Sequence, residues 1–123
     1  MGDYAPKYLP GHDVTYTAAS AITGGQVVYL SAAGTCAITS GALTAVLGVA
    51  SRDVATGEEL AVCRGGVQRC VSGAAIAVGD PVISAATGRV VPFGAGTNYN
   101  QVLGTALTAA GGAGITVDVQ WEK

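Results

Sequence analysis

The sequence predicts an all-β fold: a small β-sandwich or barrel built from two tandem β-repeats, with an extended N-terminal arm. Three observations predict this class. Val and Thr, whose branched Cβ atoms favour strands, are plentiful, whereas Glu, Lys and Arg are scarce. The 19 Gly and four Pro residues punctuate short apolar segments without a collagen-like period. A segment of about fifty residues is repeated, with changes, in the second half of the chain.

The core is expected to be thin. A chain of 123 residues can bury most of its apolar surface without a metal ion or a disulfide. It contains only one Phe, one Trp and one Met, so small branched side chains must fill the interior.

Short segments bounded by Gly, Pro, Asn, Asp or Ser read as strands. The clearest is residues 114–121, in which apolar and polar side chains alternate up to Trp121. A single helical turn is expected around residues 42–46. The predicted strands are residues 14–17, 26–30, 35–39, 46–51, 59–64, 67–71, 81–84, 89–92, 102–108 and 114–121.

The repeat is visible in two blocks. "AITGGQVVYLSAAG" (residues 21–34) resembles "AIAVGDPVISAATG" (residues 75–88), and "VLGVA" at 46–50 resembles "VLGTA" at 102–106. Further on, Leu60-Ala61-Val62 aligns with Ile115-Thr116-Val117. One such unit cannot bury its apolar face alone, but two can close on each other.

We therefore expect an arm of residues 1–13 and a single β domain of residues 14–123, with repeats of about 14–72 and 73–123. Within each repeat, Gly25 and Gly79 are predicted to supply a backbone conformation costly for other residues. Gly48 and Gly104 are predicted to permit close approach of a second backbone.

Charge is unusually sparse. Charged residues make up 11% of the chain, against about 25% in a typical soluble domain. None lies between Val14 and Ser51. This shortage favours a surface covered by other subunits or partners; the alternative is the neutral exterior of a hardy extracellular protein. A net charge of −2 argues against nucleic acid as a partner.

No membrane or export signal is expected. The longest uncharged region is interrupted by Gly, Ser and Thr, which argues against a membrane span. The N-terminus, "MGDYAPKYLPG", lacks an apolar segment of signal-peptide length. We expect a protein made and used without Sec export.

The three cysteines are predicted to be small buried residues in a reducing cytoplasm. Their odd number excludes complete pairing within one chain, and "CRGGVQRC" matches no zinc pattern. If Gly65-Gly66 formed a two-residue turn, Cys63 would face Gln68, and Cys70 would lie diagonally, in poor disulfide geometry. Cys36 is the third cysteine.

No catalytic group is predicted. The single histidine, His12, lies in the arm, and no nucleophile elbow or metal-binding motif is present. Glu58 and Glu59 are sequence neighbours, which on a strand point to opposite faces. We expect neither an enzyme nor a metal or cofactor site.

The arm is the candidate contact segment. Residues 1–13 read either as a frayed terminus or as an arm that docks on a neighbour. Two of the five Tyr residues lie here, which favours docking. Aromatic anchors carry much of the energy of an interface. The predicted contacts with a capsid or a neighbouring subunit are Tyr4, Tyr8, Leu9 and Pro10.

The motif order resembles a known family. "LPGHDVTYTAASAITGGQVV", "VLGVASRDVATGEELAVCRGGV" and "GAAIAVGDPVISAATGRVV" are similar to the capsid cement, or head decoration, proteins of tailed phages. The resemblance spans about Gly11 to Val119. It implies a virion protein, made in the host cytoplasm, that binds major capsid protein on the outside of an expanded head, often as a trimer at three-fold positions.

Two other functions remain open. A tail tube or fibre subunit would stack into rods. A small β-clip-like ligand-binding module would need convergent polar groups in a pocket, and the sequence shows no obvious set. A secreted disulfide-bonded surface protein is a more distant alternative, which a count of free thiols would exclude.

Overall fold

The computed structural model describes residues 14–122, and these form an all-β fold, which confirms the predicted class. All ten predicted strands are present within a residue or two of their expected ends. They are β1 (Val14–Ala18), β2 (Val27–Ala32), β3 (Thr35–Ile38), β4 (Val46–Ala50), β5 (Glu59–Cys63), β6 (Val67–Val71), β7 (Pro81–Ala85), β8 (Arg89–Pro92), β9 (Val102–Ala106) and β10 (Thr116–Trp121).

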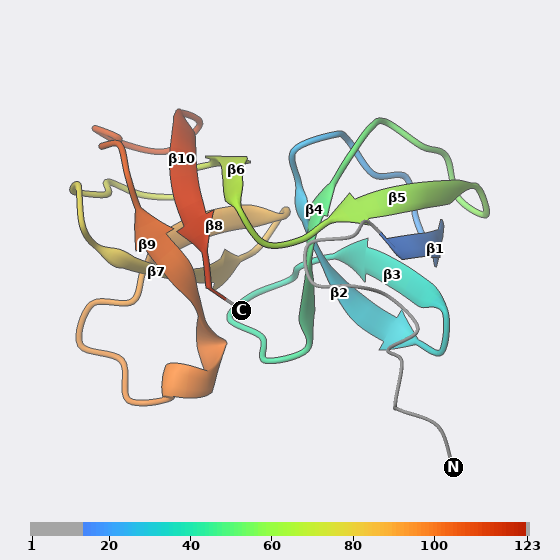
Figure 1. Ribbon diagram of the computed structural model, residues 1–123, viewed down its shortest axis with the longest axis horizontal. Helices are drawn as coiled ribbons and strands as arrows, with labels where there is room; N and C mark the ends of the chain where they lie inside the picture. The colour runs from blue at the N-terminus through green and yellow to red at the C-terminus, as the bar shows by residue number, and fades with distance from the viewer. Residues whose placement is uncertain (1–13, 123) are drawn as a thin grey trace, which may run out of the picture.

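The strands form two sheets that lie side by side (Figure 1). Strands β1 to β5, here called lobe 1, make a closed barrel in the order β1-β3-β2-β4-β5. Strands β6 to β10, here called lobe 2, make a five-stranded sheet in the order β6-β10-β9-β7-β8. Barrel closure removes the free strand edges on which other chains could pair.

The two lobes share one topology. In lobe 1, β1 is antiparallel to β5 and parallel to β3. In lobe 2, β6 is antiparallel to β10, and Ser72, just after β6, forms a parallel bridge with Val90 of β8. The order β3-β2-β4 corresponds to β8-β7-β9. The two repeats seen in the sequence thus correspond to two copies of one five-stranded unit.

The equivalence of the last strands differs from the sequence alignment. Leu60 pairs with Tyr16 in lobe 1, and Val117 pairs with Cys70 in lobe 2. Leu60 is therefore the structural counterpart of Val117 and not of Ile115. The strand register itself is the same in both lobes, since Ala50 pairs with Val62 and Ala106 pairs with Val119. The Gly-rich β9–β10 loop is longer than the β4–β5 loop, so the last strand lies further along the sequence in lobe 2.

The connection between the lobes is a crossover and not a hairpin. Cys63 lies opposite Val49 and Gln68 lies opposite Val119, so the two-residue hairpin turn that would have set Cys63 opposite Gln68 does not form. Each strand pairs within its own lobe, and Gly65-Gly66, with φ of 66° and 61°, redirects the chain between them. The sheet of lobe 2 therefore begins with β6.

The predicted helical turn at residues 42–46 does not form. Its backbone makes bonds to lobe 2 instead: Leu43 N donates to Ser84 Oγ at 3.0 Å, and Ala42 O accepts from Gln101 Nε2 at 3.3 Å. The helical turn of the described chain is a 3₁₀ turn, η1 (Tyr99–Gln101), whose Asn98 side chain accepts from Asn100 N.

Both predictions about glycine are confirmed. Gly25 and Gly79 have φ of 90° and 88°, a region that L side chains avoid. A Cβ at Gly48 would collide with the carbonyl oxygen of Cys63, and one at Gly104 would collide with that of Gln120. In each lobe, a glycine at the equivalent position of the strand therefore allows the neighbouring backbone to approach closely.

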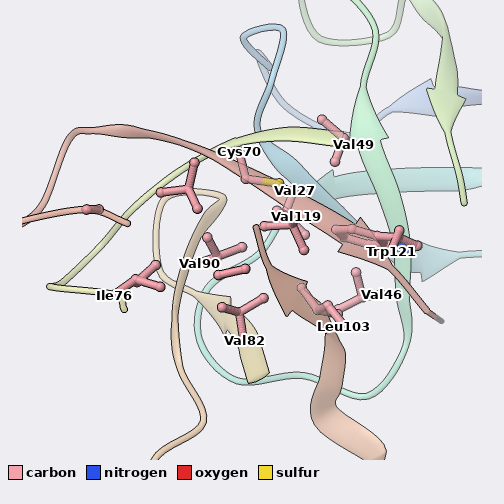
Figure 2. Close-up of a cluster of buried hydrophobic side chains, with 13 residues drawn as sticks. Val27, Val46, Val49, Cys70, Ile76, Val82, Val90, Leu103, Val119 and Trp121 are labelled. Carbon is pink, nitrogen blue, oxygen red and sulfur yellow. The ribbon is translucent and has the colours of Figure 1, made fainter. Parts of the chain in front are cut away.

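The lobes share a hydrophobic core. One buried cluster lies within lobe 1 and includes Val28 and Leu60. The second cluster fills lobe 2 but also takes in Val27, Val46 and Val49 from lobe 1 (Figure 2). Each fully buried Val or Leu contributes about 1.5–3 kcal/mol relative to exposure, so separating the lobes would be costly.

Buried polar contacts fix the lobes together. The hairpin between β7 and β8 reaches into lobe 1, where Gly88 O accepts from Val27 N at 2.8 Å. Thr39 Oγ1 donates to Ala85 O at 2.7 Å, and Ser84 Oγ donates to Gly41 O at 2.7 Å. Thr39 and Ser84 are fully buried, and a buried hydroxyl that lost its partner would destabilise the fold.

Candidate binding surface

The acidic and amide side chains of the repeated turns serve the backbone. Gln26 Oε1 accepts from Thr23 N at 2.8 Å, and Asp80 Oδ2 accepts from Ala77 N at 2.9 Å at the equivalent turn of lobe 2. Glu58 Oε1 likewise accepts from Ala55 N at 2.6 Å. Residues 14–122 contain no cluster of side chains suited to hold a metal ion. These groups stabilise turns.

No disulfide joins the three cysteines, all of which lie in the described part of the chain. Cys36 and Cys70 are buried, as expected, and Cys63 is half-buried. Burial raises the pKa of the Cys36 thiol. Burial, followed by the negative charge of Asp118, raises the pKa of Cys70 to about 12. Because the thiolate is the reactive form, Cys36 and Cys70 are poor nucleophiles and metal ligands.

A cleft lies where the lobes meet. In lobe 1, Thr17 N donates to Gly34 O at 3.0 Å and closes the β1–β3 seam. The counterpart of that carbonyl, Gly88 O, is bound instead to Val27 N of lobe 1. Gly88 O therefore does not close the β6–β8 seam of lobe 2 as Gly34 O closes that of lobe 1. A cleft of about 190 Å³ lies beside this seam. Its lining is Thr23, Gly24, Gln26, Val71, Thr87, Gly88 and Arg89.

This cleft has few features of a ligand site. Small-molecule sites usually enclose about 300–1,000 Å³ with several convergent polar groups. Arg89 is the charged residue of the lining, and Gln26 Nε2 is already engaged with Thr87 O at 3.1 Å. The cleft follows from the docking of the β7–β8 hairpin onto lobe 1.

Exposed apolar side chains are a stronger sign of contact. Six large ones are exposed in the described chain: Leu30 (42%), Val67 (56%), Val78 (66%), Tyr99 (76%), Leu107 (42%) and Ile115 (42%). Tyr99 packs on Phe93, with ring centroids 5.2 Å apart. Val78, Leu107 and Ile115 belong to the two loops at one end of lobe 2, the β6–β7 and β9–β10 loops.

The predicted contact residues Tyr4, Tyr8, Leu9 and Pro10 lie outside the described residues, as does His12. Their role stays a prediction. The sequence pattern did not single out Val78, Leu107 or Ile115. A position-by-position comparison of the two repeats could have found Val78, because its counterpart in the first repeat is Gly24.

A model of the phage cement protein family matches residues 9–121, nearly the whole chain. The chain belongs to the phage cement protein family. The family resemblance predicted from the motifs is thereby confirmed, and it identifies a bacteriophage virion structural protein.

A solved structure has the same fold as this cement protein. It is "the crystal structure of head fiber gp8.5 N base in bacteriophage phi29", which superposes with a TM-score of 0.69 over 90% of this chain and 93% of that chain, at 22% identity. No curated protein sequence matches the chain. None of the helices in residues 14–122 is long and apolar enough to cross a membrane.

Proposed function

We propose that this cement protein binds the outer surface of an expanded phage head and stabilises contacts between major capsid protein subunits. The match of the family model to residues 9–121 carries the proposal. The proposed assembly is a homotrimer, with residues Tyr4, Tyr8, Leu9 and Pro10 of the arm among its contacts. The proposed role is mechanical and involves no catalysis, metal or cofactor.

The surface suits a protein that is covered on several sides. Strands β1 to β4 of lobe 1 lie in the uncharged stretch between Val14 and Ser51. Charged side chains at an interface core are costly to desolvate, so their absence favours contact with protein. A freely dissolved domain normally carries a more charged surface.

The rigidity of the molecule suits reinforcement. The two lobes share a core and are joined by buried hydrogen bonds, such as that from Thr39 Oγ1 to Ala85 O. A rigid body that touches two capsid subunits resists their separation, whereas a hinged one would yield. Weak contacts then add up, because the subunits of a closed shell are already fixed in place.

Co-sedimentation with phage heads tests the proposal. The purified protein is mixed with heads before and after expansion, and bound copies are counted against the major capsid protein. Saturable binding at a fixed ratio to expanded heads alone is the expected result. Absence of binding to either form contradicts the cement role.

A second function is favoured by one observation. The superposable structure is titled as the base of a head fiber, so this chain could form the base of a longer appendage on the head. This function predicts a further projecting component bound to the protein. Electron microscopy of decorated heads distinguishes the two, since a cement protein leaves low knobs and a fiber base carries projections.

A further inference from the structure

The two lobes can be compared with each other at one corresponding end of each. The loops β1–β2 and β4–β5 form this end in lobe 1, and the loops β6–β7 and β9–β10 form it in lobe 2. A bridge joins the paired loops in both lobes: Ile22 with Val54 in lobe 1, and Ile76 with Ala110 in lobe 2. The backbones of these ends therefore correspond.

Two further hydrogen bonds fix the correspondence of single residues. Ser51 N donates to Ala61 O in lobe 1, and Leu107 N donates to Asp118 O in lobe 2. Ser51 is thus the counterpart of Leu107.

Glu58 and Ile115 are matched in the same way. Ala18 N donates to Glu58 O in lobe 1, and Ser72 N donates to Ile115 O in lobe 2, both at 2.8 Å. Glu58 is thus the counterpart of Ile115.

The side chains at these equivalent positions differ in one direction. Gly24, Ser51 and Glu58 of lobe 1 are replaced by Val78, Leu107 and Ile115 in lobe 2, and all six are exposed. The charges of the loops differ as well: the β4–β5 loop holds Arg52 and Asp53, whereas residues 107–117 hold no charge. In the other pair of loops, Asp80 of lobe 2 stands where lobe 1 has Gln26, and each serves the backbone of its turn. Small or polar residues of lobe 1 therefore have large apolar counterparts in lobe 2.

The fold itself does not require this change. Lobe 1 forms the same backbone with Gly, Ser and Glu at the three positions, so the apolar side chains are not needed for the turns or the barrel. Large exposed apolar side chains on neighbouring loops are a sign of a contact site, and the Ile76–Ala110 bridge makes these two loops neighbours. The loops that carry them lie on the side of lobe 2 away from lobe 1 (Figure 1), where lobe 1 cannot cover them.

We propose that Val78, Leu107 and Ile115, here called the distal patch, form the surface by which the protein docks on the assembled phage shell. This inference rests on the proposed cement function and adds the face that makes the contact. The matching shell surface is apolar, because the three side chains of the distal patch carry no charge; Asp80 is the charged residue of these two loops.

The small area of the distal patch indicates which kind of partner it can bind. A standard stable interface takes roughly 800 Å² from each partner, and three partly exposed side chains supply only a fraction of that area. Such a patch cannot hold two free copies together. It can hold a subunit on a preassembled lattice, where each weak contact is supported by the others.

The test exchanges the distal patch for the residues of lobe 1. The patch variant carries Val78→Gly, Leu107→Ser and Ile115→Glu. The matched control is Leu30→Ser, which makes the same substitution at a leucine with the same exposed fraction of 42%. Binding to expanded heads, sedimentation velocity of the free protein and the melting temperature are measured for each.

The expected result is a loss of head affinity of about tenfold or more in the patch variant. The Leu30→Ser control should stay within about twofold of the wild type, and both variants should keep the oligomeric state and melting temperature of the wild type. The single variant Leu107→Ser, with a smaller loss, covers the case in which the triple variant fails to fold.

Two outcomes overturn the proposal while leaving the cement role intact. Unchanged head binding of the folded patch variant would mean that the docking face lies elsewhere. A loss of self-association in the free patch variant would make the distal patch a contact between copies. Failure of the wild-type protein to bind heads would refute the cement function itself, and the docking proposal with it.

Discussion

Thr39 Oγ1 donates a 2.7 Å hydrogen bond to the carbonyl oxygen of Ala85, and this bond joins lobe 1 to the β7–β8 hairpin of lobe 2. Thr39 is fully buried, so no water can replace the bond. Its backbone takes part in the same junction, because Thr39 O accepts from Gly88 N at 3.2 Å. The lobes are therefore expected to unfold together.

The variant Thr39→Val should lower the free energy of unfolding by about 1–3 kcal/mol. It retains the shape of the side chain but leaves the Ala85 carbonyl without its hydroxyl donor. Urea unfolding followed by fluorescence of Trp121, the single tryptophan and a buried one, measures the loss. Thr15→Val, at an exposed position of β1, is the control and should change stability by less than about 0.5 kcal/mol. Equal effects of the two substitutions would contradict this role for Thr39.

The variants Gly48→Ala and Gly104→Ala should each prevent folding or cost more than about 3 kcal/mol. The added Cβ would meet the carbonyl oxygen of the neighbouring strand, which is backbone and cannot move aside. Gly111→Ala is the control, since no atom lies within 4 Å of the position that its Cβ would occupy and its φ is not positive. Thermal unfolding monitored by circular dichroism compares the three. A well-folded Gly104→Ala variant with wild-type stability would show that β9 and β10 can separate without cost.

The strands were predictable because they depend on local sequence. Gly, Pro and polar residues end each segment, and the duplicated "Val-Leu-Gly" motif marks the strand that another backbone approaches closely. The crossover at Gly65-Gly66 was not predictable in the same way. Two glycines between strands suit either a hairpin or a passage to another sheet, and distant partners such as Val119 for Gln68 decide between them. Residues 42–46 have the composition of a helix, but Ala42 and Leu43 bond to lobe 2, and Ala45 O accepts from Leu30 N of lobe 1.

The candidate surface was less accessible from sequence. Val78 lies in the repeat that the sequence reveals. Whether its side chain is exposed, however, depends on which other residues cover the end of lobe 2, and the sequence does not show this. Ile115 shares an alternating pattern with the buried Val117 and Val119, so its pattern indicates a core position. Periodicity assigns a side chain to a face of a strand, but it does not show where the neighbouring sheet ends.

Stability should fall between pH 9 and pH 12 because of Cys70. Burial, and then the charge of Asp118, raise its pKa from an ordinary value of 9.0 to about 12. The folded state keeps the thiol proton in this range while the unfolded state releases it, so the stabilising effect is complete below pH 9 and is lost as pH rises toward 12. The free energy of unfolding should decline by about 1.4 kcal/mol per pH unit from this group.

The variant Cys70→Ala isolates this effect. It will be less stable than the wild type at neutral pH because it leaves a small cavity. Its stability should nevertheless fall less steeply above pH 9, since the other titrating groups are common to both proteins. Urea unfolding at intervals from pH 8 to pH 11 gives the two slopes. Parallel slopes would show that the thiol of Cys70 is not held protonated by the fold.

Deletion of residues 1–10 should weaken attachment to heads and leave the melting temperature nearly unchanged. The segment holds Tyr4, Tyr8, Leu9 and Pro10, the predicted contacts, and it precedes β1, whose pairing with β5 begins at Val14. Aromatic anchors carry a large share of interface energy, so the double variant Tyr4→Ala/Tyr8→Ala should reproduce most of the effect. Tyr99→Ala, at an exposed tyrosine on η1, is the matched control and should bind as the wild type does. A large fall in melting temperature on deletion would show that the arm is part of the fold. Unchanged head binding would show that the arm makes no important contact with the head, and attachment would then depend on the distal patch.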